Sequence, residues 1–350
     1  MLNNKVSFSS LFISSVLCSA VTFSVCYAKF KRSPIHSTSA AVAATLAPTV
    51  VPSCGTVSHR LEGYKYIKPL LYVDKTCETG HLANLKTELV GQLDVYKQSG
   101  VIDNASIYLK LLGQGSGGEF ISINENNYYH PGSLIKLPIL ITYMTMEEKH
   151  PGTLDKKIVF TQPKGGIPHQ TYNSHQIEPG KSYSIKELLK YMVAFSDNNA
   201  TYLLNENVDL EAFKKMFSDF GLIVPDVHDM NYQISAKDYS AFLKVIYNSG
   251  YLTISNSEYV AELLSQCDFK DGMQSGLPEN VQLAHKFGEW GDRKDPNVHQ
   301  LSESGIVYLN NSPYLITVMT QGRDVKKLPE VLKSISKLTF NKVKETEVPF

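Results

Sequence analysis

The chain has 350 residues, of which 43% are apolar, and its 34 lysines and arginines balance 34 aspartates and glutamates. A chain of this length and composition can bury one large core of mixed type or two small ones, which excludes disorder of the chain as a whole. The balanced charge provides no net field to attract nucleic acid or an anionic surface, so we expect a small-molecule substrate and no nucleic-acid partner.

The first 28 residues have the pattern of an export segment. Lys5 precedes an apolar, serine-rich stretch over residues 8–28, which suits a cleaved signal peptide but is also near the length that spans a bilayer. Both interpretations stay open, and the second implies membrane association through residues 8–28. Residues 29–53 are rich in Ser, Ala, Thr and Pro and are predicted to be a linker, so the folded domain is expected over 54–350.

Export affects how the cysteines are interpreted. Cys54 and Cys77 flank the start of the folded part, and disulfides persist in exported proteins, so we predict a bridge between them. Two separate buried thiols are the alternative. Cys267 has the apolar neighbours of a buried structural residue. The histidines are scattered without metal-ligand spacing, so neither a metal nor another cofactor is expected.

The predicted elements change character twice along the domain. A strand over 66–73 and a helix over 81–98 precede two strands at 105–112 and 119–124, joined by a glycine-rich turn. An apolar helix over 133–149 begins a helical region. The helices that follow are expected at 184–194, 198–205, 210–220, 236–249 and 255–266. Strands return at 282–287, 302–309 and 314–320, and a helix over 325–338 ends the domain. A sheet assembled from both ends of the domain, with a helical insertion, is therefore predicted.

The first chemical motif is Ser133-Leu-Ile-Lys136, at the expected start of the apolar helix. Unpaired N–H groups there favour negative charge beside the serine hydroxyl. Lys136 lies one turn further on the same face, where burial and nearby cations would lower its pKa and let it take the serine proton. The pattern alone is weak, because it recurs at Ser334-Ile-Ser-Lys337 in an amphipathic helix.

The second motif is Ser196-Asp197-Asn198, between two apolar helical stretches. A helix cap is the simplest explanation for Asp197. Three polar groups between apolar helices would also place a hydroxyl and a carboxamide at the mouth of a cleft. Ser196 could pass a proton to a leaving group there, and Asn198 could hydrogen-bond a substrate amide.

The third motif, Lys286-Phe287-Gly288, ends a predicted strand. Its ammonium could hold a substrate carboxylate, and Gly288 would let backbone approach a ligand closely. A lysine two residues before a glycine also occurs at Lys164 and Lys270, both in predicted loops.

In this order, the three motifs resemble those of the penicillin-recognising serine hydrolases, most closely the class A β-lactamase-like family. The resemblance covers residues 66–338 and includes the flanks SLIKLPILITYM, NATYLL and VQLAHK. It implies an α/β (α+β) fold of the β-lactamase/transpeptidase type. In that fold an antiparallel sheet built from both chain ends faces an all-helical subdomain, and the site lies between them.

The resemblance also assigns roles to residues of this chain. Ser133 would be the acylated nucleophile, Lys136 its proton partner and Ser196 the relay to the leaving nitrogen. Asn198, Phe287 and Gly288 would contact the substrate, and Lys286 would bind its carboxylate region. The backbone N–H groups of Ser133 and Glu289 would form the oxyanion hole, and such a pair of donors is worth several kcal/mol to the tetrahedral intermediate.

The chain departs from the family pattern in two places. Phe287 stands where the family usually has Thr or Ser, so a hydroxyl that would contact the substrate carboxylate is absent. No E-x-x-L-N motif, whose glutamate activates the deacylating water in class A enzymes, occurs between residues 205 and 236. Asp226 and Asp229 are the nearest carboxylates, and a surface loop is the default explanation for both.

The missing glutamate separates four hypotheses. The leading one is an active-site-serine β-lactamase that turns over β-lactams. The others are a penicillin-binding D,D-peptidase that acts on acyl-D-Ala-D-Ala of peptidoglycan, an anchored β-lactam sensor acylated without turnover, and an inactive relative. The expected protein is a monomer, exported to a bacterial periplasm or anchored in the inner membrane facing it.

Overall fold

The computed structural model describes residues 54–345 apart from 79, 114–117, 164–170, 173, 227–230 and 293. The predicted export segment and linker therefore lie outside the described residues. Within the described part of the chain, no helix is long and apolar enough to cross a membrane.

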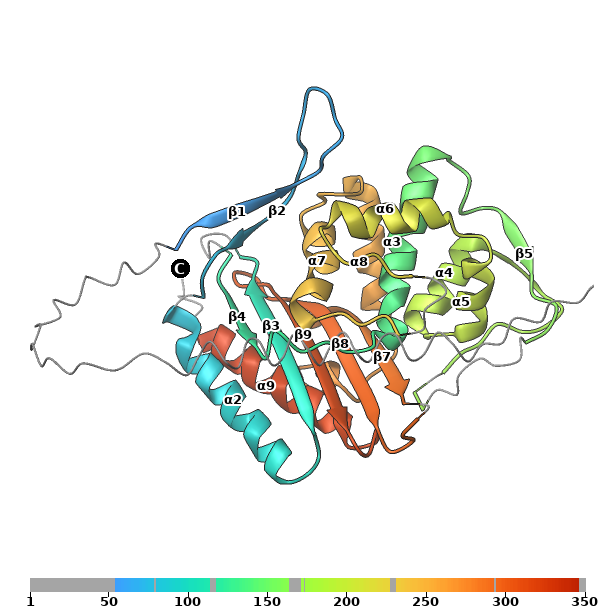
Figure 1. The fold of residues 1–350 in the computed structure, drawn as a ribbon. Coiled ribbons are helices and arrows are strands. Elements are labelled where there is room, and N and C mark those ends of the chain that lie inside the picture. The colour runs from blue at the N-terminus through green and yellow to red at the C-terminus, as the bar shows by residue number, and fades with distance from the viewer. Residues whose placement is uncertain are drawn as a thin grey trace, which may run out of the picture. The chain divides into compact units, whose positions relative to one another are not determined.

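A five-stranded sheet of antiparallel pairs forms the centre of the domain (Figure 1). Its order places two strands from the first part of the domain beside three from the last, which confirms the predicted assembly from both ends. In spatial order the strands are β4 (Phe120–Ile123), β3 (Asn104–Leu111), β9 (Tyr314–Gly322), β8 (His299–Tyr308) and β7 (Gln282–Gly291). β7 is an edge strand, so its outer side is open to contact other parts of the chain.

Two helices from opposite ends of the domain, α2 (Ala83–Gln98) and α9 (Leu328–Glu345), cover one face of the sheet (Figure 1). Leu85, Leu89 and Leu93 repeat every fourth residue along α2 and are buried, as expected for one apolar helix face. They belong to a hydrophobic cluster that includes alternate residues of the central strands, such as Ile107 and Leu109. This pair of helices and the sheet form one layer of the core.

The helical insertion packs against the other face through a second hydrophobic cluster. Its helices are α3 (Lys136–Lys149), α4 (Ile185–Ala194), α5 (Asn198–Asn205), α6 (Leu210–Asp219), α7 (Ala236–Tyr247) and α8 (Ile254–Ser265). Short 3₁₀ turns precede α2 and α3 and follow α8, and β5 (Lys157–Val159) pairs with β6 (Ser182–Ser184). α3 is buried over most of its length because its first nine residues are nearly all apolar.

A two-stranded ribbon of β1 (Thr56–Arg60) and β2 (Leu70–Lys75) begins the domain. The strand predicted over 66–73 in fact begins at Leu70, because Pro69 has no N–H for the ladder and residues 66 and 67 are exposed. β1 has no buried face that could have been recognised in the sequence. The predicted disulfide between Cys54 and Cys77 is confirmed and joins the two ends of this ribbon.

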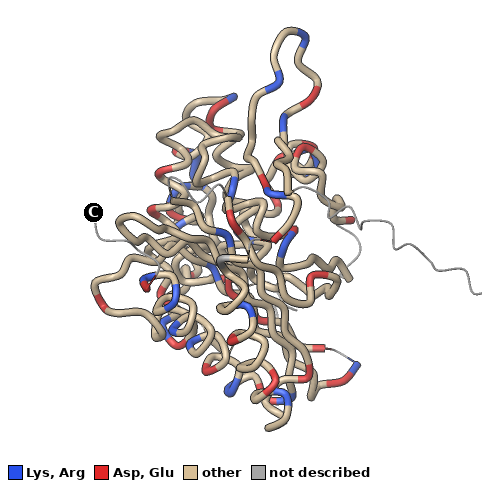
Figure 2. Tube along the Cα trace, turned by 90° about the vertical axis from the view of Figure 1, so that its left-hand side faces the viewer, with Lys and Arg blue, Asp and Glu red and all other residues tan. Residues whose placement is uncertain are grey.

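Charged residues of both signs are interspersed along the chain (Figure 2). Most occupy exposed positions, and a few are buried as pairs. Lys110 and Lys244 both contact the carboxylate of Asp74, at 2.5 and 2.7 Å, which ties the ribbon to β3 and α7.

Candidate active site

Ser133 lies in a 3₁₀ turn, Gly132–Ile135, that leads directly into α3. The predicted helix therefore starts with a tighter turn at the serine, and Pro138 falls in the first turn of the α-helical part, where it is tolerated. The Ser133 side chain is almost buried, with a relative exposure of 8%. This turn fixes the position of the hydroxyl at the boundary between sheet and helices.

Two glycines let the serine turn pack directly on strand β7. Gly132 has φ +51°, and a Cβ atom added there would lie 2.3 Å from the carbonyl oxygen of Glu289. A Cβ atom added to Gly288 would lie 2.3 Å from the carbonyl oxygen of Pro131. Only residues without a side chain allow this approach. The backbone of Ser133 and that of Glu289 are thereby held next to each other.

Lys136 reaches from α3 to the second motif. Its Nζ donates to the carbonyl oxygen of Ser196 at 2.6 Å, to the Ser196 hydroxyl at 3.1 Å and to Oδ1 of Asn198 at 2.8 Å. Burial, and then the positive charge of Lys286, hold the pKa of Lys136 well below its usual value. A lysine in this environment loses its proton more readily than an exposed lysine does.

The second motif combines a helix cap with an unusual backbone conformation. Asp197 caps α5, accepting from the backbone N–H of Asn199 at 2.8 Å, and also accepts from the N–H of Ile177 at 2.8 Å. The cap interpretation of Asp197 is therefore supported. Ser196 has φ +54°, a conformation that costs free energy in a residue other than glycine and is common at functional sites. This turn directs the Ser196 hydroxyl at the two lysines.

Lys286 approaches the same hydroxyl from β7. Its Nζ donates to Ser196 Oγ at 3.1 Å, and the side chain is buried. Burial lowers the pKa of Lys286 to about 8, although negative charge on Cys267, Asp268 and Glu303 opposes the shift. The structure thus brings together Lys136, Ser196, Asn198 and Lys286 from three separate motifs, with the Ser133 turn between α3 and β7.

Phe287 packs into an aromatic cluster behind the strand. Its ring is 2% exposed, stacks on Phe269 with centroids 4.3 Å apart and meets the edge of Tyr172 at 6.5 Å. The Lys286 ammonium lies 4.0 Å from the centre of the Phe287 ring, within the range of a cation–π interaction. Phe287 stands in the sequence where the family pattern has Thr or Ser, and its ring belongs to the hydrophobic cluster that includes α2 and α9.

The segment at Thr171 and Tyr172 is attached to the end of β7. The Glu289 carboxylate accepts from the backbone N–H of Thr171 at 2.8 Å and from its hydroxyl at 2.5 Å. The Tyr172 hydroxyl donates to the carbonyl oxygen of Val325 at 3.2 Å. The side chain of Glu289 is therefore engaged with this segment, and only its backbone is left to serve the serine turn.

A buried polar cluster behind Lys286 was not recognised in the sequence. His285 Nδ1 lies 2.6 Å from Oε1 of Glu303, and Oε2 of Glu303 accepts from the backbone N–H of Met273 at 2.7 Å. Cys267, interpreted from its apolar neighbours as an inert buried thiol, belongs to this buried group, and its charge acts on the pKa of His285. In the sequence, only His285, directly before the lysine motif, could have indicated this cluster. The residues that it meets come from segments distant in the sequence.

The cluster carries charge. Burial raises the pKa of the Cys267 thiol, but the positive charges of His285 and Lys286 lower this pKa overall. Burial lowers the pKa of His285, yet Cys267 and Glu303 raise it to about 10. Charge on Cys267 and Glu303 in this cluster raises the pKa of Lys286 and so opposes the effect of burial.

The two candidate deacylating carboxylates have different positions. Asp226 is exposed and lies at the edge of a cavity of about 570 Å³ that Pro131 and Gly132 also line. Asp229 lies outside the described residues. Within the described ranges, no group of three or more His, Cys, Asp or Glu side chains is placed to hold a metal ion.

A model of the β-lactamase enzyme family matches residues 91–343 of the chain. No curated protein matches the chain. Among solved structures, a β-lactamase from Chitinophaga pinensis has a TM-score of 0.61 at 19% identity, over 73% of this chain and 98% of that one. The TLA-1 extended-spectrum β-lactamase has a TM-score of 0.61 at 17% identity, over 73% and 98%. A PBP-A mutant, solved as an acyl-enzyme complex with penicillin G, has a TM-score of 0.59 at 19% identity, over 75% and 97%. At these identities the solved structures establish the fold alone.

Proposed function

Because the chain belongs to the β-lactamase enzyme family, we propose that this β-lactam-acting serine hydrolase forms an acyl-enzyme on Ser133. The observation that carries the proposal is the convergence of two buried lysine Nζ atoms, those of Lys136 and Lys286, on the Ser196 hydroxyl, each at 3.1 Å. A serine flanked in this way can move a proton in either direction. No structural role requires two lysines to be buried at one hydroxyl, since burying an ammonium group is costly.

In the proposed acylation, Lys136 starts as the neutral amine. The Ser133 hydroxyl loses its proton to Nζ of Lys136 while its Oγ bonds to the lactam carbonyl carbon. The negative oxygen that forms is held by the backbone N–H groups of Ser133 and Glu289. The carbon–nitrogen bond then breaks, and a proton passes from Lys136 through Ser196 to the leaving nitrogen. The product is an ester on Ser133 with a secondary amine in the opened ring.

The remaining residues would orient the substrate. Lys286 in its charged form would attract the substrate carboxylate. Asn198 would hydrogen-bond the side-chain amide, and Gly288 would let the substrate lie against β7. The expected contact with Phe287 is not part of this proposal, because its ring is buried against Phe269 and has no hydroxyl to offer. This difference predicts weaker binding of penicillins that rely on a carboxylate–hydroxyl contact.

Deacylation is where the candidate functions separate. Asp226 is the one carboxylate among the described residues that line the cavity beside Gly132, and we propose it as the group that activates water in a β-lactamase. The lack of an E-x-x-L-N motif between residues 205 and 236 favours a second candidate, a penicillin-binding D,D-peptidase or sensor whose β-lactam adduct persists. The Cys54–Cys77 disulfide fits export to an oxidising compartment in either case.

The test follows the intact mass of the purified full-length chain after mixing with a penicillin or a cephalosporin, with loss of the drug assayed in parallel. An adduct that forms and clears while drug is consumed supports the β-lactamase, and replacing Asp226 with Asn should then make it persist. A stable adduct supports the peptidase or sensor. Ser133→Ala should abolish labelling and leave the fold unchanged by circular dichroism. Labelling of that variant would exclude Ser133 as the nucleophile.

A further inference from the structure

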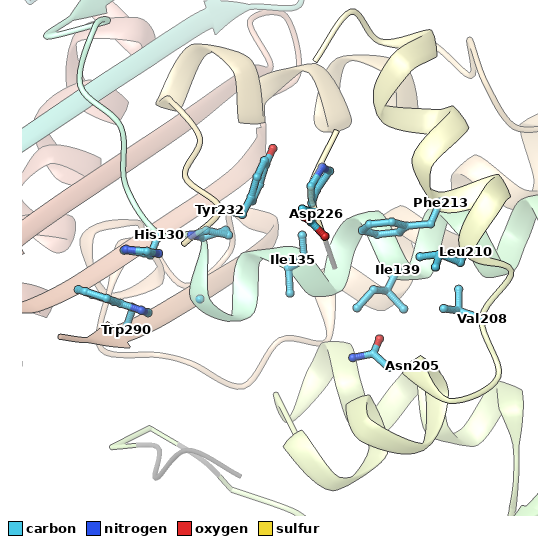
Figure 3. Close-up of a pocket in the computed structure, with 13 residues that line it drawn as sticks. His130, Ile135, Ile139, Asn205, Val208, Leu210, Phe213, Asp226, Tyr232 and Trp290 are labelled. Atoms are coloured by element: carbon cyan, nitrogen blue, oxygen red, sulfur yellow. The ribbon is translucent and has the colours of Figure 1, made fainter. Parts of the chain in front are cut away.

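A largely apolar cavity of about 570 Å³ lies beside the serine turn. Figure 3 shows Ile135 and Ile139 of the serine turn and α3 between Trp290 at one end and residues that follow α5 at the other. Cavities of this size commonly accommodate small organic ligands. Its apolar side chains are Ile135, Ile139, Val208, Leu210, Phe213 and Trp290.

The cavity lies beside the backbone that would hold the reacting carbonyl. Gly132, which lines it, precedes Ser133, and Trp290, which also lines it, follows Glu289. Ser196, Lys136 and Lys286 do not line it. A carbonyl bound between the N–H groups of Ser133 and Glu289, with its leaving nitrogen toward Ser196, would direct its other substituent to the side where the cavity lies.

The side chains that line the cavity determine which kind of acyl substituent it can bind. The polar end of the cavity is held rigidly, because the His130 ring stacks on Trp290 with centroids 4.0 Å apart and the His130 N–H donates to Gln300 at 2.9 Å. Between this end and Phe213, the floor is formed by the aliphatic chains of Ile135 and Ile139. Such a surface gains free energy by covering hydrocarbon and offers little to a charged group.

We propose that this cavity binds the acyl group of the substrate, and that the preferred substrates are lactams or amides whose acyl group carries an extended apolar chain. The inference rests on the proposed function for the direction of the acyl group. Ligand binding to the cavity can be tested without any reaction, because an amide that carries the acyl group can bind without a nucleophile.

The first experiment uses the full-length Ser133→Ala variant and the straight-chain amides from acetamide to octanamide. Trp290 is the single tryptophan of the chain, so its fluorescence reports ligand at the cavity. Each added methylene should tighten binding about fourfold, from about 0.8 kcal/mol per buried CH₂, until the cavity is full. Fluorescence that does not respond to any amide, or an affinity independent of chain length, would overturn the proposal.

Matched variants locate the binding. Val208→Phe adds bulk inside the cavity, whereas Val159→Phe makes the same change at an exposed position on β5 that does not line it. Val208→Phe should lower the affinity for octanamide at least tenfold and leave acetamide unchanged, and Val159→Phe should change neither. Leu210→Phe serves as a second cavity variant if Val208→Phe melts below the parent. Equal octanamide binding by folded cavity variants and the control would count against the site.

The second experiment separates this inference from the proposed function. The acylation rate of the unmodified chain is measured with 6-aminopenicillanic acid and its acetyl, hexanoyl and octanoyl derivatives. Rates that rise with chain length, and lose this rise in Val208→Phe, support the cavity as the acyl site. Equal rates for all derivatives would overturn it and leave Ser133 acylation intact. Chain-length-dependent amide binding without any acylation would support the cavity and refute the proposed function.

Discussion

Replacing Gly132 with alanine should disable acylation while the domain stays folded. The added Cβ atom would lie 2.3 Å from the Glu289 carbonyl oxygen and 3.1 Å from the Glu289 amide nitrogen. These are backbone atoms of a paired strand, so they cannot rotate away as the end of a side chain would. The turn and the strand must separate, which moves the two proposed oxyanion donors apart.

The size of the effect follows from two separable contributions. Alanine at φ +51° costs about 1–2 kcal/mol of stability. Loss of one oxyanion donor costs about 10²–10³ in rate, or roughly 3–4 kcal/mol. We therefore expect Gly132→Ala to acylate at least a hundredfold more slowly, with a modest decrease in the free energy of unfolding.

Two further glycine variants separate strain from displacement. Gly152→Ala introduces the strain alone, since Gly152 has φ +87° and nothing within 4 Å of the added atom. It should lose stability and keep its acylation rate. Gly288→Ala introduces the clash without a positive φ and should lose acylation. The assay is the second-order rate of adduct formation by mass, combined with urea unfolding. An acylation rate for Gly132→Ala equal to that of Gly152→Ala would refute the oxyanion arrangement.

Three other predictions concern the charged groups of the site. Lys136→Ala should slow acylation about 10²–10⁴-fold, since it removes the general base, and an unchanged rate in rapid-mixing experiments would exclude that role. Because the pKa of Lys286 is about 8, its charge, and with it the affinity for an anionic β-lactam, should fall as pH rises through about 8. Lys286→Arg should remove this dependence, because arginine stays charged; a decline that persists in the arginine variant would assign it to another group. Cys267→Ala should move the pH decline to lower pH, because charge on Cys267 opposes the lowering of the Lys286 pKa by burial. A decline at unchanged pH would show that the thiol does not act on Lys286.

Local patterns in the sequence were sufficient for much of the fold. The apolar run after Ser133 predicts a buried helix, and the positions of the strands on either side of the helical region predict a sheet from both ends of the domain. The prediction was wrong where local pattern carries little information. β1 has no apolar face, and the start of β2 depends on the pairing that Pro69 prevents.

The sequence by itself determined which residue types are available for catalysis and in what order they occur, because spacing along one helix or one turn is a local property. It places Lys136 one turn from Ser133, and it places Ser196 beside the cap of α5. Only the tertiary structure decided that Lys136 and Lys286 share one hydroxyl, that Phe287 packs with Phe269, and that Cys267 meets His285. Contacts of this kind depend on how strands and helices distant in sequence pack, and the burial that lowers both lysine pKa values exists only once they have packed.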